Sequence, residues 1–395
     1  MIVPFPPQNP KSQTEELWHK LRCQFTLDDS GLKKTDIESG FDWPDDLALI
    51  MHSSGSTGVP KSIPYGWKRM RTNAQLMMNF LSDQPNLARH VCALSFCTSA
   101  GLYNAILVPL LTNGTIIYTP QASAFGIRKF AEVIKNQNAD YIWVNPTVLK
   151  LMEGIALKDN LSPQARFLSC TAPLTHADAV KYENLFKRPV LQSYGLTETL
   201  FVTVEKPGRN VDKEFSSGEV LGGKEAISVD PQDGNLLIQN NSIMPGYIQI
   251  SNNSYNYYMP EGSVSEVVFK SSDIGSLDQY GRLHISGRSS NVINVEGFKI
   301  GMEALEEVIS HSGLVTDVAT AKRTDLHGNE KPVLLVTSAG SVDIDAIKNL
   351  CVAKLGNKAR PEEVIVVAEI PRTANGKINR DLIQKLYGIK HENSK

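Results

Sequence analysis

The sequence has few features that would tie it to a membrane or to an oxidising compartment. Its five cysteines are odd in number and widely scattered along 395 residues, which indicates neither a disulfide framework nor a zinc site and favours a reducing compartment. The N-terminus lacks a basic start followed by an apolar run, and no stretch is long and apolar enough to span a bilayer. We therefore expect a cytoplasmic protein with no membrane partner.

An excess of charge of one sign is also missing. Lys and Arg number 40 against 42 Asp and Glu, and the composition, 41% hydrophobic and 21% charged, is that of an ordinary globular protein, so no nucleic-acid partner is expected. The spacing suggests no Ser/His/Asp triad, and the eight histidines form no cluster of metal-ligand type. The length favours two or three domains.

Hydrophobic patterning divides the chain into three regions. Between residues 90 and 193, short apolar runs alternate with segments of helical period, which is typical of βαβ units in a mainly parallel sheet. After residue 198, short strands separated by Gly and Asn predict an antiparallel, barrel-like part, and from about residue 288 mixed helices and strands predict a small α+β domain. One buried helical face is predicted at i, i+3, i+4 and i+7, by Ile127, Phe130, Ala131 and Ile134.

A strand expected at residues 48–51 leads into a loop rich in hydroxyl groups and glycine. Glycine lets backbone N–H groups face an anion, hydroxyls add donors and a lysine adds charge, which together suit a polyphosphate. The kinase and GTPase pattern requires Gly directly before Lys, and Pro60, which has no N–H, stands there instead. A flexible surface turn would have the same composition. The candidate residues are Ser53, Ser54, Gly55, Ser56, Thr57, Gly58 and Lys61.

The whole string at residues 52–61 resembles the phosphate loop of the adenylate-forming superfamily, which includes acyl- and aryl-CoA ligases, peptide-synthetase adenylation domains and luciferases. Residues 193–198 resemble a second element of that family, which implies that Tyr194 stacks on adenine, Thr197 meets the α-phosphate and Glu198 holds Mg²⁺, with Ser193 and Gly195 beside the nucleotide. An aromatic face and a hard oxygen ligand suit these tasks. Taken alone, the six residues would equally fit a strand end and a turn.

Two further segments resemble parts of the family's nucleotide pocket. Residues 169–174 are similar to a small-residue segment that lines the adenine pocket and is usually richer in glycine, which implies contacts from Thr171, Ala172 and Pro173. Residues 272–275 and 281–288 resemble the stretch that grips the ribose. An aspartate can accept hydrogen bonds from both ribose hydroxyls, and an arginine can add donors. The implied residues there are Asp273, Ile285 and Arg288. Residues 243–247 match a family element that we expect to be structural.

Residues 371–380 closely resemble the family's C-terminal loop, whose lysine, here Lys377, contacts the carboxylate and phosphate during adenylation. A cation there neutralises charge between an anionic nucleophile and a triphosphate. A solvated lysine on an exposed tail is the alternative interpretation. Residues 294–300 look like the thiolation loop, with Gly297 and Phe298 beside the thiol channel. The hinge is expected at Ser290, where relatives commonly carry Asp or Lys.

The candidate acyl pocket lies where many relatives carry an aromatic residue or histidine three positions before a glycine, and Thr98 occupies that position here. A packing role at a strand end fits these residues equally well. The pocket is expected to be small to medium in size and mostly apolar, which allows aryl, short-chain or medium-chain acids. Its candidate residues are Phe96, Thr98, Gly101 and Leu102.

The resemblance implies an α/β fold with a large N-terminal adenylation domain, residues 1–289, and a small mobile C-terminal α+β domain, residues 290–395. The large domain is expected to combine a parallel βαβ sheet with the antiparallel barrel-like part. Because the loop begins as early as Ser53, a shortened N-terminal subdomain is expected. A homodimer partner would then cover the exposed apolar surface.

The function implied is ATP-dependent activation of a small carboxylic acid to an acyl-adenylate, followed by transfer to the thiol of coenzyme A. ATP, Mg²⁺ and coenzyme A would be the cofactors, and catalysis would rest on positioning and electrostatics. Two alternatives stay open. One is an acyl- or aryl-AMP ligase that loads the phosphopantetheine of an acyl-carrier protein. The other is a non-catalytic nucleotide-binding module.

Overall fold

The structure is a computed structural model, and it describes residues 3–4, 11–28, 31–37, 41–53, 61–81, 88–96, 98–119, 126–155, 157, 161–210, 215–251, 254–259, 268–296, 298–324, 330–373 and 377–388. The chain divides into two compact units. The first comprises Met1–Ser228, Leu237–Lys270 and Gln279–Leu283, and the second comprises Val229–Leu236, Ser271–Asp278 and His284–Lys395. The domain boundary at residues 289 and 290 stays a prediction.

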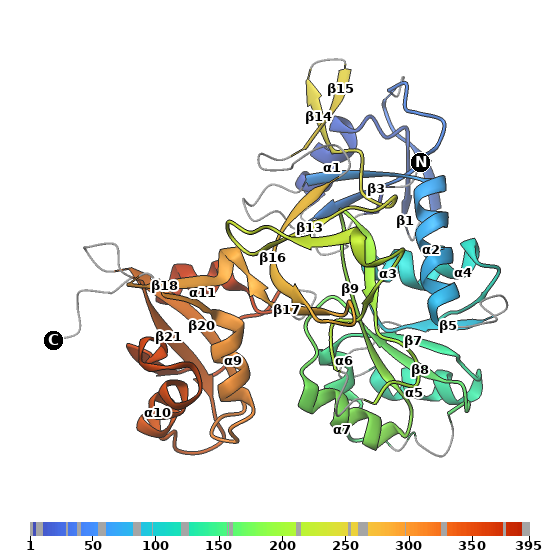
Figure 1. Ribbon diagram of the computed structural model, residues 1–395. Coiled ribbons are helices and arrows are strands. Elements are labelled where there is room, and N and C mark those ends of the chain that lie inside the picture. The colour runs from blue at the N-terminus through green and yellow to red at the C-terminus, as the bar shows by residue number, and fades with distance from the viewer. Residues whose placement is uncertain are drawn as a thin grey trace. The chain divides into compact units, whose positions relative to one another are not determined.

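The first unit is organised around a seven-stranded sheet of order β11-β10-β9-β8-β7-β5-β6 (Figure 1). The five strands from β6 to β9 in this order pair in parallel, as predicted, and β10 pairs antiparallel with both β9 and β11. The strands are β5 Arg89–Cys92, β6 Thr115–Ile117, β7 Tyr141–Val144, β8 Arg166–Ser169, β9 Val190–Leu196, β10 Leu200–Val204 and β11 Glu219–Val220.

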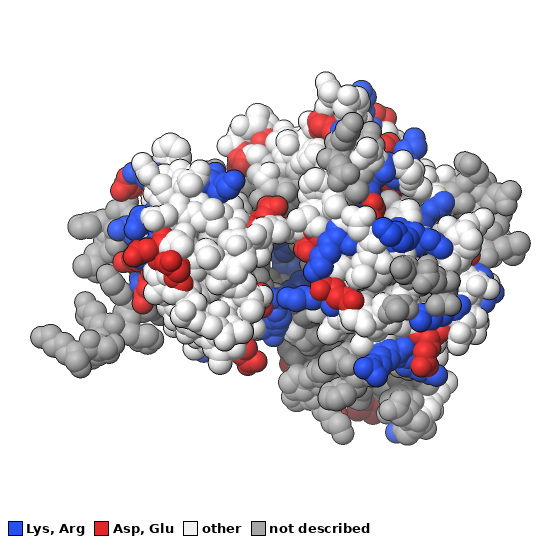
Figure 2. All heavy atoms as spheres, turned by 90° about the horizontal axis from the view of Figure 1, so that it is seen from below, with Lys and Arg blue, Asp and Glu red and all other residues white. Residues whose placement is uncertain are grey.

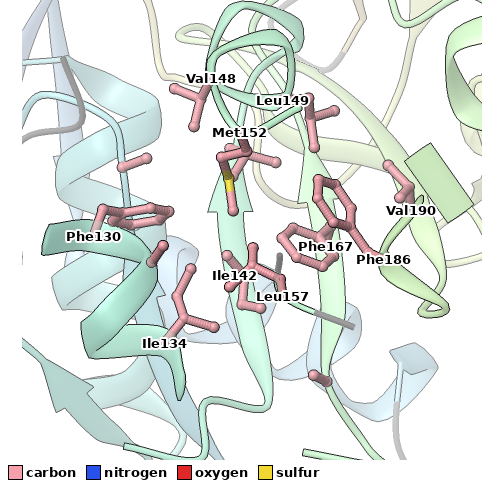
Figure 3. Close-up of a cluster of buried hydrophobic side chains, with 14 of the residues drawn as sticks. Phe130, Ile134, Ile142, Val148, Leu149, Met152, Leu157, Phe167, Phe186 and Val190 are labelled. Atoms are coloured by element: carbon pink, nitrogen blue, oxygen red, sulfur yellow. The ribbon is translucent and has the colours of Figure 1, made fainter. Parts of the chain in front are cut away.

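Helices cover this sheet because their apolar faces need a partner. All four residues of the predicted helical face are buried on α5 (Ile127–Asn136), and every side chain of β7 is buried, as a strand covered on both faces requires. Figure 3 shows the core that results, with Phe130 and Ile134 against Ile142. The other helices of this unit are α2 Trp67–Leu81, α3 Ser99–Leu102, the π-helix η1 Tyr103–Leu107, α4 Val108–Leu111, α6 Pro146–Leu151 and α7 His176–Phe186.

Three smaller antiparallel pairs of strands belong to the first unit. The strand predicted before the glycine-rich loop is β3 (Leu47–Ser53), and it pairs with β4 (Lys61–Gly66). The hairpin of β14 (Tyr247–Ser251) and β15 (Ser254–Tyr258), yellow in Figure 1, contacts β4 through β14. The remaining elements are α1 Lys11–Lys20, β1 Phe25–Asp28, β2 Gly31–Lys34 and the 3₁₀ turn η3 Lys224–Ala226.

The second unit holds most of a four-stranded sheet and the expected α+β part. The four-stranded sheet has the order β12-β13-β16-β17, and a three-stranded sheet has the order β20-β21-β22 with one antiparallel and one parallel pair. Two clusters of buried apolar side chains form its core. The elements are β12 Ile227–Val229, β13 Asn235–Ile238, β16 Phe269–Leu277, β17 Leu283–Arg288, η4 Ser289–Asn291, β18 Val292–Val295, β19 Phe298–Gly301, α9 Met302–Ser310, β20 Asp317–Thr324, β21 Glu330–Thr337, α10 Ile344–Leu355, η5 Asn357–Ala359, β22 Glu363–Val366 and α11 Arg380–Tyr387.

Two global properties bear on function. Among the described helices, none combines the length and the hydropathy that crossing a membrane would need. Figure 2 shows one face of the molecule, on which Lys and Arg side chains are interspersed with Asp and Glu.

Candidate functional site

Three of the segments singled out by sequence lie at one edge of the seven-stranded sheet. Strands β5, β7, β8 and β9 are parallel neighbours, so their carboxyl ends meet at the same edge. Residues 95–102 follow β5, residues 170–174 follow β8 and residues 193–198 end β9. The strand order reverses at β5, which has β6 on one side and β7 on the other. Ligands bind at this kind of reversal in α/β sheets.

The tip of the glycine-rich loop lies outside the described residues, and with it the candidates Ser54, Gly55, Ser56, Thr57 and Gly58. Its two ends are described. Ser53 and Lys61 are register partners where β3 and β4 close, so the loop leaves and re-enters the same antiparallel pair. The Lys61 Nζ lies 4.9 Å from the ring centroid of Tyr247 on β14. Burial lowers the pKa of His52, next to the loop, to about 4, so this ring is neutral at pH 7.

Thr197 and Glu198 lie on the tight turn between β9 and β10. Leu196 pairs with Leu200, and the Thr199 N–H donates to the Leu196 carbonyl at 3.2 Å. A Cβ on Gly195 would lie 2.0 Å from the Leu200 carbonyl oxygen, a distance at which no side chain fits. The glycine of the predicted element is therefore required by the close approach of the two strands.

Contacts from distant segments fix this turn. The hydroxyl of Tyr65, a side chain buried on β4, donates to the Thr197 carbonyl at 2.5 Å, and the Met244 N–H donates to the Glu198 carbonyl at 2.9 Å. The hydroxyls of Ser99 and Thr197 lie 3.0 Å apart, which brings the start of α3 to the turn. Burial, followed by the charge of Glu198, holds the pKa of Tyr65 well above its usual value, so Tyr65 stays a donor.

The acyl-pocket candidates follow β5 and begin α3. The Thr98 hydroxyl caps this short helix, accepting from the Gly101 N–H at 3.1 Å and donating to the Ser95 carbonyl at 2.7 Å. A Cβ on Gly101 would lie 1.9 Å from the Ser95 carbonyl oxygen. Thr98 and Gly101 thus have local structural tasks. Phe96 and Leu102 are half-buried, and a pocket role for all four stays a prediction.

A network of buried hydrogen bonds anchors the segment that follows β8. Leu174 N–H donates to the Gln192 side chain at 2.6 Å, and the Gln192 N–H donates to Glu205 at 2.7 Å. Thr171 adopts φ of 71°, in the left-handed region, while Ala172 is half-buried and Pro173 exposed. Ser193 on β9 is buried, and its hydroxyl has no hydrogen-bond partner among the described residues. A role of Thr171, Ala172, Pro173 and Ser193 in nucleotide binding stays a prediction.

Replacing Thr171 by glycine should stabilise the protein by about 0.5–1 kcal/mol. The left-handed conformation costs a residue with a Cβ about 1–2 kcal/mol, and the greater freedom of glycine in the unfolded chain offsets part of that gain. Urea unfolding measures the change. Ala172→Gly is the matched control, because Ala172 has no positive φ, and it should lose about 0.5–1 kcal/mol. If Thr171→Gly lost as much unfolding free energy as Ala172→Gly, the argument that Thr171 is strained would be contradicted.

In the second unit, the pair predicted to grip ribose is brought together. Asp273 on β16 is buried, and the Arg288 Nε at the end of β17 donates to its Oδ1 at 2.7 Å. Ile285 on β17 is half-buried. Ser290 is exposed in the short turn η4, and Phe298 is 64% exposed on β19. Gly297 lies outside the described residues.

Lys377 follows residues 374–376, which lie outside the described residues, and the described segments on both sides of them are anchored in the second unit. Thr373 N–H donates to the Lys377 carbonyl at 2.8 Å. On one side Arg372 pairs with Asp317 at 2.8 Å, and on the other Arg380 binds Glu303 and Glu306 at 3.2 and 2.9 Å. The Lys377 side chain is exposed. This arrangement places a cation at the start of an anchored segment.

Comparison with known proteins identifies the family. A model described as AMP-binding enzyme matches residues 6–251, and one described as AMP-binding enzyme C-terminal domain matches residues 304–377. The chain belongs to the AMP-binding enzyme family. The predicted superfamily, with its α/β fold of a large sheet domain and a small C-terminal domain, is thereby confirmed.

Curated relatives and solved structures agree with this assignment. A 2-succinylbenzoate–CoA ligase of Listeria monocytogenes is 27% identical over 86% of this chain and 70% of the relative, and an oxalate–CoA ligase of Arabidopsis thaliana is 26% identical over 87% and 68%. The ATP-bound MatB structure from Rhodopseudomonas palustris has a TM-score of 0.82 at 19% identity over 98% of this chain and 83% of that one. The Bacillus subtilis o-succinylbenzoate CoA synthetase structure, in complex with its acyl-adenylate, has a TM-score of 0.72 at 21% identity over 89% and 72%. These two structural likenesses establish the fold.

Three residues at the candidate site were missed by the sequence motifs. Tyr65 and Ser99 were not singled out, and Tyr247 belongs to an element expected to be structural. Tyr65 contacts a residue 132 positions away, and Tyr247 one that is 49 positions away. The one available signal was that Tyr247 ends the family element at residues 243–247.

Proposed function

We propose that the chain is an AMP-forming acid–thiol ligase that activates a small carboxylic acid with ATP and transfers the acyl group to coenzyme A. Membership of the AMP-binding enzyme family and the CoA ligase names of the curated relatives support this activity. The observation that carries the proposal is the Thr197–Glu198 turn, which contacts Ser99 and Tyr247, and the Tyr247 ring in turn contacts Lys61. One edge of the sheet thus gathers groups suited to a triphosphate and its metal.

Magnesium fits the donor at this turn. Glu198 Oε1 accepts a hydrogen bond from Tyr247, whereas Oε2 accepts none within the described part of the chain. Mg²⁺ is commonly held by one or two carboxylates together with substrate phosphates. In this proposal Glu198 is the protein ligand of Mg²⁺, and the positive charge supplied there offsets the charge of the phosphates.

The remaining roles follow the sequence prediction. Thr197 donates to the α-phosphate, and Lys61 and the glycine-rich loop bind the leaving pyrophosphate. Tyr194 and residues 171–173 bind adenine, and Asp273 with Arg288 binds ribose. Lys377 supplies its cation during adenylation. A rotation about Ser290 then brings Gly297 and Phe298 to the thiol.

The acyl acceptor and the setting of the enzyme belong to the same proposal. Coenzyme A is preferred because the named relatives are CoA ligases. The phosphopantetheine of an acyl-carrier protein offers the same thiol arm and is the second candidate. A cytoplasmic location follows from the scattered cysteines, and a homodimer is the assembly that we propose.

The purified chain should release pyrophosphate and form a thioester when given ATP, Mg²⁺, coenzyme A and the correct member of a panel of carboxylic acids. Both signals should disappear with excess EDTA, because the phosphates then lack their counter-charge. Mass spectrometry identifies the thioester. If thioester formed only with a holo-carrier protein, the carrier protein and not coenzyme A would be the acceptor. If the chain neither released pyrophosphate nor bound nucleotide, the proposed ligase activity would be refuted.

A further inference from the structure

Tyr247 connects three elements of the candidate site. It begins β14, its side chain is 3% exposed, and its hydroxyl donates to Glu198 Oε1 on the β9–β10 turn at 2.8 Å. The Lys61 ammonium, at the end of the glycine-rich loop, lies over its ring. One side chain thus contacts both the proposed metal ligand and the proposed phosphate-binding cation.

The backbone fixes the place of this side chain. Tyr247 and Tyr258 are register partners at the open end of the β14–β15 hairpin, and their rings lie 5.6 Å apart. Gly246 adopts φ of 142°, and a Cβ there would lie 3.0 Å from the Tyr258 carbonyl oxygen. Because β14 also contacts β4, which carries Lys61, the ring is held between a hairpin and a strand.

The hydroxyl can orient Glu198. A phenol that donates to a carboxylate makes a charge-assisted hydrogen bond, which holds the carboxylate in one rotamer. A tyrosine phenol has an ordinary pKa of about 10, so it carries its proton at pH 7 and can donate. Oε1 accepts this hydrogen bond and Oε2 accepts none within the described residues, so we assign Oε2 to the cation. Groups that orient a metal ligand in this way typically change metal affinity or activity by about 10–100-fold.

The ring has a second, separate task. A cation within about 6 Å of an aromatic centroid is attracted by the negative face of the ring. Lys61 satisfies this criterion at 4.9 Å, and its side chain is half-buried. The ring therefore holds the ammonium at the end of the glycine-rich loop.

We propose that Tyr247 is a positioning residue for the metal–nucleotide complex, in which its hydroxyl orients Glu198 for Mg²⁺ and its ring places Lys61 for the phosphates. This inference rests on the proposed function, because it needs ATP and Mg²⁺ at this edge of the sheet. It assigns two separable effects to one side chain. The hydroxyl governs the dependence on metal, and the ring governs binding of the nucleotide itself.

The test is ATP binding by calorimetry, once with EDTA and once with excess Mg²⁺. Tyr247→Phe keeps the ring, so metal-free ATP affinity should stay at the wild-type value, while the factor by which Mg²⁺ tightens binding should fall about 10–100-fold. Tyr247→Leu also removes the ring, so its metal-free affinity should fall about two- to thirtyfold. The free Mg²⁺ needed for half-maximal pyrophosphate exchange should rise in both variants.

Two comparisons separate positioning from general damage. Tyr258→Phe, on the same hairpin and 40% exposed, should leave both affinities unchanged. In Glu198→Gln, Mg²⁺ should no longer tighten ATP binding. The double variant with Tyr247→Phe should show no further loss of affinity, since the two residues act as one unit. If Mg²⁺ tightened ATP binding by Tyr247→Phe as much as by the wild type, or if the two substitutions had additive effects in the double variant, this inference would be overturned. The proposed ligase function would be unaffected. A wild-type chain that binds no ATP overturns both.

Discussion

Lys377→Ala should lower the rate of adenylation by about two to three powers of ten. The lysine is expected to neutralise charge that develops between the attacking carboxylate and the triphosphate, and removing one such group typically costs that much. The structure supports a clean substitution, because the Lys377 side chain is exposed and the described segments on both sides of residues 374–376 are anchored by Arg372 and Arg380. Acid-dependent pyrophosphate exchange measures the loss.

The same variant should leave the second half of the reaction intact. Given a synthetic acyl-adenylate and coenzyme A, Lys377→Ala should form thioester at the wild-type rate, because the lysine serves the first step only. Lys385→Ala on α11 is the control, since Lys385 is exposed on the same unit, and both half-reactions should be unchanged in it. A loss shared equally by the two half-reactions would show that Lys377 has a structural role instead.

Gly195→Ala should destabilise the protein by about 1–3 kcal/mol and lower adenylation by about a hundredfold. The added Cβ would lie 2.0 Å from the Leu200 carbonyl oxygen, so β9 and β10 must move apart. Thr197 and Glu198 lie on the turn that joins these strands, and a shift of about 1 Å in a positioning group can cost that factor in rate. Urea unfolding and pyrophosphate exchange, measured on the same preparation, give the two quantities.

Gly154→Ala provides a matched control, because a Cβ at Gly154 would have no atom within 4 Å. We expect it to change neither stability nor activity by a measurable amount. If Gly195→Ala kept wild-type activity despite a loss of stability, the position of the turn would not matter for catalysis. The roles proposed for Thr197 and Glu198 would then need to be reconsidered.

Much of the fold could be predicted from local patterns. The helical face of α5 and the parallel pairing from β5 to β9 agree with the sequence prediction. The apolar run that begins near residue 90 forms a strand only as far as Cys92, because the chain then turns toward the Thr98 cap of α3. The helix α2 was not predicted, although Met70, Ala74 and Met77 recur at helical spacing on its buried face.

The candidate site was predictable only in part. Motifs named the residue types that suit a nucleotide, and the structure brings Asp273 to Arg288 and the start of α3 to Thr197. Motifs could not name Tyr247, because a tyrosine in a short strand has the same local pattern whether it packs or binds. Its partners, Glu198 and Lys61, come from two other elements of the chain.

The sequence by itself determined the family, the parallel sheet and the need for glycine at turns, because these depend on periodicity, local sterics and short strings of residues. Only the tertiary structure decided which hydroxyl meets which carbonyl or carboxylate. Tyr65 and Thr197 are 132 residues apart, and a hydrogen bond over that separation depends on how β4 packs beside the β9–β10 turn. Packing of that kind follows from the summed contacts of many residues, and no short stretch of sequence encodes it.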